Sequence, residues 1–310
     1  SVGGPLLPVL SFLVYKAVVV IVDILHGVDQ RYARLDYAGA SLIMQGISSL
    51  GAFSLVLVLT NSLMAAIWGM TATAVLILVL FDIRKARLLS DIRPRIKLVS
   101  ARQLAITCFP AVASGVLCSA VVTVARQFLF VMEGEAALGA YASVATLAAI
   151  VQMGASYVYN PLLGLFAEYV HNKEKAKIVS LICKVCVAIV FITMAVSLLF
   201  ALFGEFGLAL LFGPDIVQYV YLLQPMLLCT ALTAYIWFFM DLLIVMRSML
   251  GILVANVVAF ASVFPFSYWC ISNYGANGVS FAGALSYAVG CAVLVFCTVR
   301  FLRKEMGENE

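Results

Sequence analysis

Residues 108–132 read CFPAVASGVLCSAVVTVARQFLFVM, and after the short break EGEAALG (133–139), residues 140–169 read AYASVATLAAIVQMGASYVYNPLLGLFAEY. Each run is long enough to cross the hydrocarbon layer of a membrane, about 30 Å thick, as a helix. The pair therefore predicts two membrane-spanning helices joined by a short loop. Arg126 and Gln127 interrupt the first run. An isolated guanidinium in lipid costs roughly 2.5–3.5 kcal/mol on insertion scales, so we expect Arg126 to face protein or a water-filled cavity.

The composition of the whole chain agrees with this pattern. Of 310 residues, 65% are hydrophobic and only 11% are charged, which is outside the range of soluble domains. The formal net charge of +4 does not indicate nucleic-acid binding, because the basic residues fall in loops that membrane topology explains. The sequence predicts an all-α, polytopic transmembrane helix bundle.

Apolar stretches of membrane-spanning length predict about nine spans. They lie near residues 5–25, 38–59, 62–81, 104–131, 138–167, 178–203, 216–245, 250–272 and 277–302. All basic residues other than Lys16 and Arg126 lie in or beside one alternating set of loops, and the opposite loops hold none. The positive-inside rule makes the basic loops cytoplasmic, which predicts a cytoplasmic C-terminus. The chain opens SVGGPLLPVL without Met, and we expect a fragment that has lost upstream helices.

Four later spans carry an internal proline, at positions 110, 161, 225 and 265. Proline removes an intrahelical hydrogen bond and tends to kink a helix. Broken helices are common in transporters, although kinked packing with no moving part would leave the same pattern. The mixed-charge segment 82–103, with Pro94 at its centre, is predicted to link two bundles.

Lys16 and Arg126 are the two basic residues deep in predicted spans. Lys16 could instead be structural, bridged to Asp23 on the same helix face, and Arg126 could reach the outer interface. No acidic residue falls near a midplane: Asp29 and Asp82 are assigned to inner loops, as is His26, which reads as an ordinary interfacial residue. Cation relays use intramembrane carboxylates, so a basic lumen favours an anionic substrate such as a diphosphate.

Neutral polar side chains also occur within the spans, among them Gln127, Gln152 and Asn160. They would suit contacts with sugar hydroxyls, but joining helices by hydrogen bonds is the commoner use of such residues. The pair Cys183 and Cys186 has metal-site spacing, yet it lies in an apolar helical run without a partner histidine. The sequence predicts no catalytic residues, no metal site and no cofactor.

Three segments resemble the polysaccharide-transport branch of the multidrug/oligosaccharidyl-lipid/polysaccharide (MOP) flippase superfamily. They are QRYARLDY at 30–37, RQF at 126–128 followed by LGAYA at 138–142, and GANGV at 275–279. The resemblance implies a two-lobe transporter that lacks its first three helices. Residues 1–81 would be the remainder of the N-terminal lobe, 82–103 the cytoplasmic linker, 104–302 the six-helix C-terminal lobe and 303–310 a cytoplasmic tail.

The same resemblance implies export of polyprenyl-diphosphate-linked oligosaccharide repeat units by alternating access. Such export serves cell-surface polysaccharides such as lipopolysaccharide O-antigen, and the implied location is the cytoplasmic (inner) membrane. Membrane lipids and the polysaccharide assembly machinery are the implied partners. The predicted substrate-binding residues are Lys16, Arg126, Gln127, Gln152 and Asn160. Two alternatives stay open: a cation-coupled multidrug antiporter of the same superfamily, and a membrane-embedded polysaccharide polymerase or ligase.

Overall fold

A computed structural model describes residues 6–32, 34–89 and 98–304 of the chain. All regular secondary structure within these ranges is helical, which confirms the predicted fold class. Part of the predicted linker (90–97) and of the predicted tail (305–310) lies outside the described residues. The chain divides into two compact units, an N-terminal unit from Ser1 to Lys97 and a C-terminal unit from Leu98 to Glu310.

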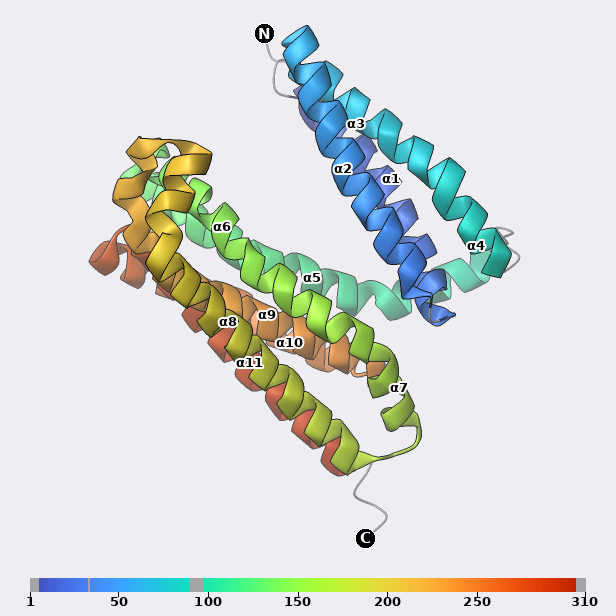
Figure 1. Cartoon of the computed structure of the whole chain (residues 1–310). Coiled ribbons are helices and arrows are strands. Elements are labelled where there is room, and N and C mark those ends of the chain that lie inside the picture. Colours follow the sequence, from blue (N-terminus) through green and yellow to red (C-terminus); the bar gives the residue numbers. More distant parts are fainter. Residues whose placement is uncertain (1–5, 33, 90–97, 305–310) are drawn as a thin grey trace. The chain divides into compact units, whose positions relative to one another are not determined.

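The N-terminal unit consists of long helices that pack side by side along their length (Figure 1). Helix α3 packs against both α1 and α2, and α1 also contacts α4. A small apolar cluster of Val22, Leu25, Leu78 and Ala86 joins α1 to the π-helical turn after α3 and to α4. The helices are α1 (Leu6–Arg31), α2 (Leu35–Thr60), α3 (Leu63–Ile77) and α4 (Ile83–Leu89), with a π-helical turn at Leu78–Asp82 between α3 and α4.

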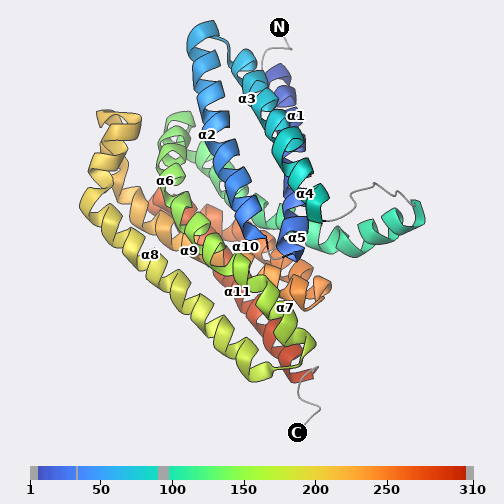
Figure 2. The ribbon, with the colours of Figure 1, turned by 45° about the vertical axis from the view of Figure 1, so that its right-hand side comes forward.

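The C-terminal unit is a larger bundle whose centre is formed by α9 and α11 (Figures 1 and 2). Helix α11 packs against α9 and α10, α10 packs against α5, and α9 packs against α6 and α8. Helix α8 lies at the edge of the bundle in Figure 2. The helices are α5 (Leu98–Glu133), α6 (Glu135–Tyr159), α7 (Leu163–His171), α8 (Lys175–Phe212), α9 (Leu223–Val245), α10 (Met249–Tyr274) and α11 (Asn277–Lys304).

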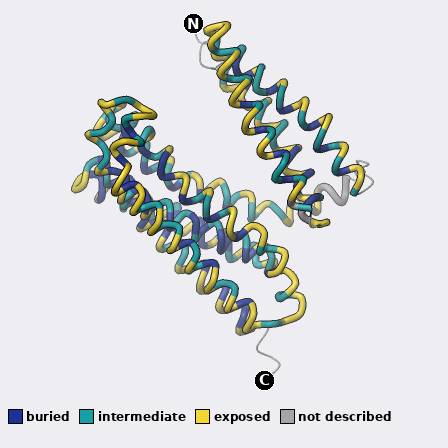
Figure 3. The backbone as a smooth tube through the Cα atoms, in the orientation of Figure 1, coloured by how far each residue is buried: buried dark blue, intermediate teal, exposed yellow. Residues whose placement is uncertain are grey.

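Nine helical segments in the described ranges are long and apolar enough to cross a membrane, as the hydrophobic runs predicted. In each of the segments Pro214–Val245 and Asn277–Arg303, half of that segment's most apolar stretch is buried inside the protein. In Lys175–Phe212, only 11% of the corresponding stretch is buried. The outward faces of the helices carry exposed Leu, Val, Ile and Phe side chains, while buried residues line the interior of each bundle (Figure 3). Apolar exteriors of this kind suit a lipid environment.

The four prolines of the later spans occupy different positions in the secondary structure. Pro110 and Pro265 lie inside α5 and α10, two helices that pack together, with the Phe128 and Phe264 rings 6.4 Å apart between centroids. Pro161 instead lies in a 3₁₀ turn (Asn160–Leu162) that separates α6 from α7. Pro225 lies in the first turn of α9, where a missing N–H costs little. All four prolines lie inside membrane-spanning segments, as predicted, but Pro161 and Pro225 do not lie in the interior of an α-helix.

Three ionisable residues are also placed differently from the sequence assignment. His26 and Asp29 lie within α1, and Asp82 is the last residue of the π-helical turn. All three are buried, with 6%, 4% and 4% of their surface exposed. Their assignment to inner loops was wrong, because helices continue beyond the end of the apolar runs and turn these side chains inward.

A tight turn joins α10 to α11. Gly275 has φ of 57° and ψ of −136°, a backbone conformation that residues other than glycine rarely adopt. Gly278 allows close approach, because a Cβ built on it would lie 2.5 Å from the backbone of Cys270 and Ile271. The turn therefore packs the start of α11 directly onto the end of α10.

Candidate functional site

A cavity of about 230 Å³ lies within the C-terminal unit, bounded by α5, α6, α9 and α11. Its lining is mixed: one cation, one amide, several hydroxyls and thiols, and three large aromatic rings. The residues that line it with polar or aromatic groups are Cys118, Ser119, Arg126, Tyr141, Gln152, Cys229, Thr230, Thr233, Trp237 and Tyr287.

Helical periodicity explains how these side chains meet. Residues three, four, seven or eight positions apart share one face of a helix. Helix α5 contributes Cys118, Val122 and Arg126 at successive steps of four. Helix α6 contributes the series 141, 145, 149 and 152, and α9 contributes 226, 230, 233 and 237. The alanines at 145 and 149 are short, so they leave room for the cavity between these faces.

The guanidinium of Arg126 is the distinctive group of the cavity. Its Nε atom is buried and has no hydrogen-bond partner among the described residues. Its Cζ atom lies 5.7 Å from the centroid of the Tyr141 ring, within range of a cation–π interaction. No carboxylate of the described chain forms an ion pair with it. A buried donor left unpaired costs free energy, so the arrangement favours an anionic ligand that accepts this hydrogen bond.

Hydrogen bonds between helices hold the walls of the cavity in place. The Tyr141 hydroxyl on α6 lies 3.0 Å from the Ser280 hydroxyl on α11. The Tyr287 hydroxyl on α11 donates to the backbone carbonyl of Cys118 on α5, at 2.8 Å. Both tyrosines are 2% exposed. Tyrosine rings fixed at both ends present a rigid surface to whatever occupies the cavity.

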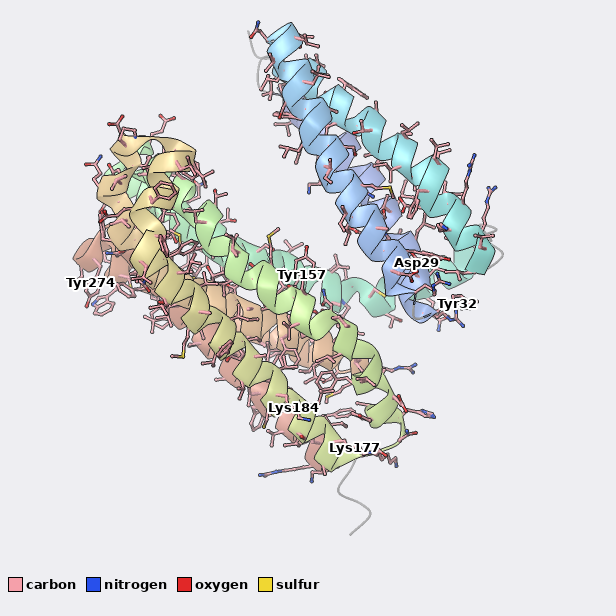
Figure 4. The ribbon with its side chains drawn as sticks, in the orientation of Figure 1. Asp29, Tyr32, Tyr157, Lys177, Lys184 and Tyr274 are labelled. Carbon is pink, nitrogen blue, oxygen red and sulfur yellow. The ribbon has the colours of Figure 1, made fainter. Side chains whose placement is uncertain are left out.

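We expect Tyr141→Phe to lower the free energy of unfolding by about 1–2 kcal/mol, because it leaves the buried Ser280 hydroxyl without this partner. Thermal unfolding of the detergent-solubilised protein measures the change. Tyr157→Phe is the matched control, because Tyr157 lies on the same helix but is 70% exposed on its outer side (Figure 4). Equal melting temperatures for the two variants would contradict this role of the Tyr141 hydroxyl.

The structure brings together two of the five residues that the sequence singled out. Arg126 and Gln152 both line the cavity. Gln127 and Asn160 are exposed and lie outside its lining. Lys16 belongs to the N-terminal unit, where it is exposed and its Nζ atom lies 5.6 Å from the Phe12 ring centroid. A vestibule shared by Lys16 and Arg126 stays a prediction, as does substrate contact by any of the five.

Sequence reasoning missed most of the cavity lining. Thr230, Thr233 and Trp237 follow one face of α9, and this polar stripe within an apolar span was a signal that could have found them. Tyr141 lay within a quoted segment but was not singled out. Within the described ranges, no cluster of three or more histidine, cysteine or acidic side chains could hold a metal ion.

Comparison with known proteins gives one informative result. The sequence matches no protein-family model and no curated relative. The fold, however, is similar to a solved structure described as the outward-facing conformation of a multidrug resistance MATE family transporter of the MOP superfamily. The TM-score is 0.69 at 11% sequence identity, over 94% of this chain and 68% of that chain. At this identity the likeness concerns the fold alone: the chain has a helical architecture similar to that of this solved structure.

Proposed function

We propose that the chain transports polyprenyl-diphosphate-linked oligosaccharides across the cytoplasmic membrane. Two findings support a transporter with an anionic substrate: the MOP-type fold and the composition of the cavity. The observation that carries the proposal is the buried, unpaired Nε of Arg126 in the cavity wall. Guanidinium groups bind phosphate oxygens through paired, charge-assisted hydrogen bonds.

The rest of the lining suits the first sugar of such a substrate. Gln152, Thr230 and Thr233 offer an amide and two hydroxyls for sugar hydroxyls. The rings of Trp237 and Tyr287 offer flat surfaces on which a sugar ring packs. A cavity of about 230 Å³ is small for a drug-sized ligand, so it would hold the diphosphate and the proximal sugar, and the remaining glycan would lie outside it.

The mechanism that we propose is alternating access, in which the head group crosses the membrane while the lipid tail stays in the bilayer. A location in the inner membrane, a cytoplasmic C-terminus and contacts with the polysaccharide assembly machinery belong to the same proposal. The protein would move its substrate without chemical change and would not be an enzyme.

A second candidate is a cation-coupled multidrug antiporter. The solved structure with the similar fold is a multidrug resistance transporter. Coupling to a cation calls for buried carboxylates, and Asp29 and Asp82 of the N-terminal unit are buried. These two observations favour the second candidate, whereas the unpaired guanidinium favours the first.

Reconstitution into liposomes separates the two candidates. A polyprenyl-diphosphate disaccharide is placed in the inner leaflet, and an externally added lectin reports the sugar that reaches the outside. Extrusion of a cationic fluorescent dye is followed in parallel vesicles. We expect the sugar to become accessible and the dye to stay inside. Dye export without sugar transfer would establish the antiporter, and failure of both would contradict transport of either substrate.

A further inference from the structure

The N-terminal unit buries three ionisable side chains together at one end. His26 and Asp29 are three positions apart on α1, so they share a face of that helix. Asp82 ends the π-helical turn that α1 packs against. Each is more than nine-tenths buried. Figure 4 shows Asp29 at the end of the unit where α4 lies.

The polar atoms of this cluster are incompletely paired. The Nε2 atom of His26 lies 3.9 Å from the Oδ1 atom of Asp82, beyond hydrogen-bonding distance. His26 Nε2, Asp29 Oδ1 and Asp82 Oδ2 are all buried without a hydrogen-bond partner among the described residues. Asp29 is close enough to both other groups to sense their charges. Buried polar groups in proteins are nearly always satisfied, so three orphaned atoms in one place call for an explanation.

Apolar packing and the π-helical turn create this arrangement. Val22 and Leu25 on α1 pack against Leu78 and Ala86, and the cluster directly follows this apolar contact. A π-helical turn inserts an extra residue into the helical register, and such turns often occur at functional sites. Here it aims Asp82 at α1, although the surrounding sequence contains neither proline nor glycine to force a break.

The charged side chains on the helices around the cluster are mostly exposed or paired elsewhere, although the charge of Arg34 acts on Asp29. On α1, Asp23 and Arg31 are exposed, and on α4, Arg84 and Arg87 are exposed; α3 carries no ionisable side chain. Beside the start of α2, Arg34 binds Asp36 at 2.8 Å, a hydrogen bond that raises the pKa of Arg34 and keeps it charged. Arg34 also stacks on the Tyr37 ring at 3.9 Å.

The remaining cation near this end is Lys85. Its Nζ atom lies 4.6 Å from the centroid of the Tyr37 ring and 5.8 Å from that of Phe81. Within the described part of the chain, it forms no ion pair with Asp29 or Asp82. Among the described residues, the ion-pair contact within this cluster is the one between His26 and Asp82.

We propose that His26, Asp29 and Asp82 together form a proton-binding site of the N-terminal unit. With a neutral imidazole, two unsatisfied carboxylates would share an apolar site, which is costly for both. A proton on the imidazole turns the His26–Asp82 contact into an ion pair, and closing the 3.9 Å gap would complete a hydrogen bond. Proton binding thereby tightens the packing of α1 on the π-helical turn and α4. The site does not depend on the identity of the transported substrate.

Histidine NMR on the full chain tests this directly, because the protein contains two histidines, His26 and His171. His171 is exposed at the end of α7 and serves as an internal reference for a solvated imidazole. With isotope-labelled histidine, the signals of both imidazoles are followed from about pH 5 to about pH 8, the range in which histidine ordinarily changes its charge. In Asp82→Asn, we expect the His26 titration curve to move to lower pH, because a carboxylate that stabilises the imidazolium is gone.

The His171 midpoint should not move in that variant, because His171 lies in the C-terminal unit. A His26 signal that does not respond to pH between about pH 5 and about pH 8 in the unmodified protein would overturn the proposal. The proposal would also be overturned if the His26 midpoint were the same in Asp82→Asn as in the unmodified protein. If Asp82→Asn does not fold, the two curves of the unmodified protein still decide. A His26 signal that responds to sodium at constant pH, and not to pH, would assign the site to a metal cation instead.

Discussion

Arg126→Ala is expected to weaken binding of a short-chain polyprenyl diphosphate by roughly ten- to a hundredfold. A hydrogen bond to a charged group contributes about 1.5–3 kcal/mol, and the buried Nε of Arg126 has no other partner in the described chain. Export of the lipid-linked oligosaccharide should be lost with it. Native mass spectrometry of the purified variant measures the binding, and the liposome assay measures the export.

The residue that follows Arg126 in the sequence supplies a matched control. Gln127 is exposed and outside the cavity lining, so Gln127→Ala should bind as the unmodified protein does. Arg126→Lys keeps the charge but loses the planar, paired donors, so it should fall between the two. A folded Arg126→Ala protein with unchanged affinity would remove the proposed role of this residue. Equal losses in the alanine variants at 126 and 127 would place the binding surface elsewhere on α5.

Gly278→Ala is expected to prevent stable folding of the C-terminal unit. The new Cβ would lie 2.5 Å from the carbonyl carbon and oxygen of Cys270 and from the Cα of Ile271. These are backbone atoms of α10, so no side-chain rotation relieves the clash and the two helices must separate. Loss of well-packed contacts on this scale costs several kcal/mol, on the order of the whole stability of a domain. Size-exclusion profiles and thermal unfolding in detergent measure it.

Gly139→Ala tests whether this effect belongs to the close approach or to any glycine in a helix. Gly139 lies on the exposed side of α6, and a Cβ added there meets nothing within 4 Å. Alanine has the higher helix propensity, so this variant should be unchanged or more stable by roughly 0.5–1 kcal/mol. Recovery of folded Gly278→Ala protein at the level of Gly139→Ala would show that α10 and α11 separate at little cost.

The positions of the spans could be read from the sequence because length and apolarity determine them almost alone. Runs such as 178–203 allow one interpretation, a helix that crosses the bilayer. The details at the helix ends could not be read in the same way. The π-helical turn at Leu78–Asp82 has no proline or glycine to mark it, and it depends on packing against α1. Pro161 and Pro225 lie inside apolar runs, and the sequence alone does not show that a 3₁₀ segment breaks the α-helix at or just before each of them.

The candidate site was harder, because a sequence does not give the rotation of a helix about its axis when nearly every face is apolar. Arg126 and Gln127 are neighbours about 100° apart around α5, and only the packing of the bundle decides that the first lines the cavity. The same uncertainty hid the cluster in the N-terminal unit. His26 and Asp82 lie near the ends of apolar runs, where charged residues usually meet water, and helix contacts bury them instead.

The pairing of α5 with α10 has a mechanical consequence. Each proline leaves one carbonyl without its usual backbone donor, at Ile106 for Pro110 and at Ala261 for Pro265. Bending stiffness is lowest at such points, and here they occur in two helices that touch. Bending of the bundle should therefore concentrate in α5 and α10. Helix α9, whose proline is confined to its first turn, should stay straight while this pair bends.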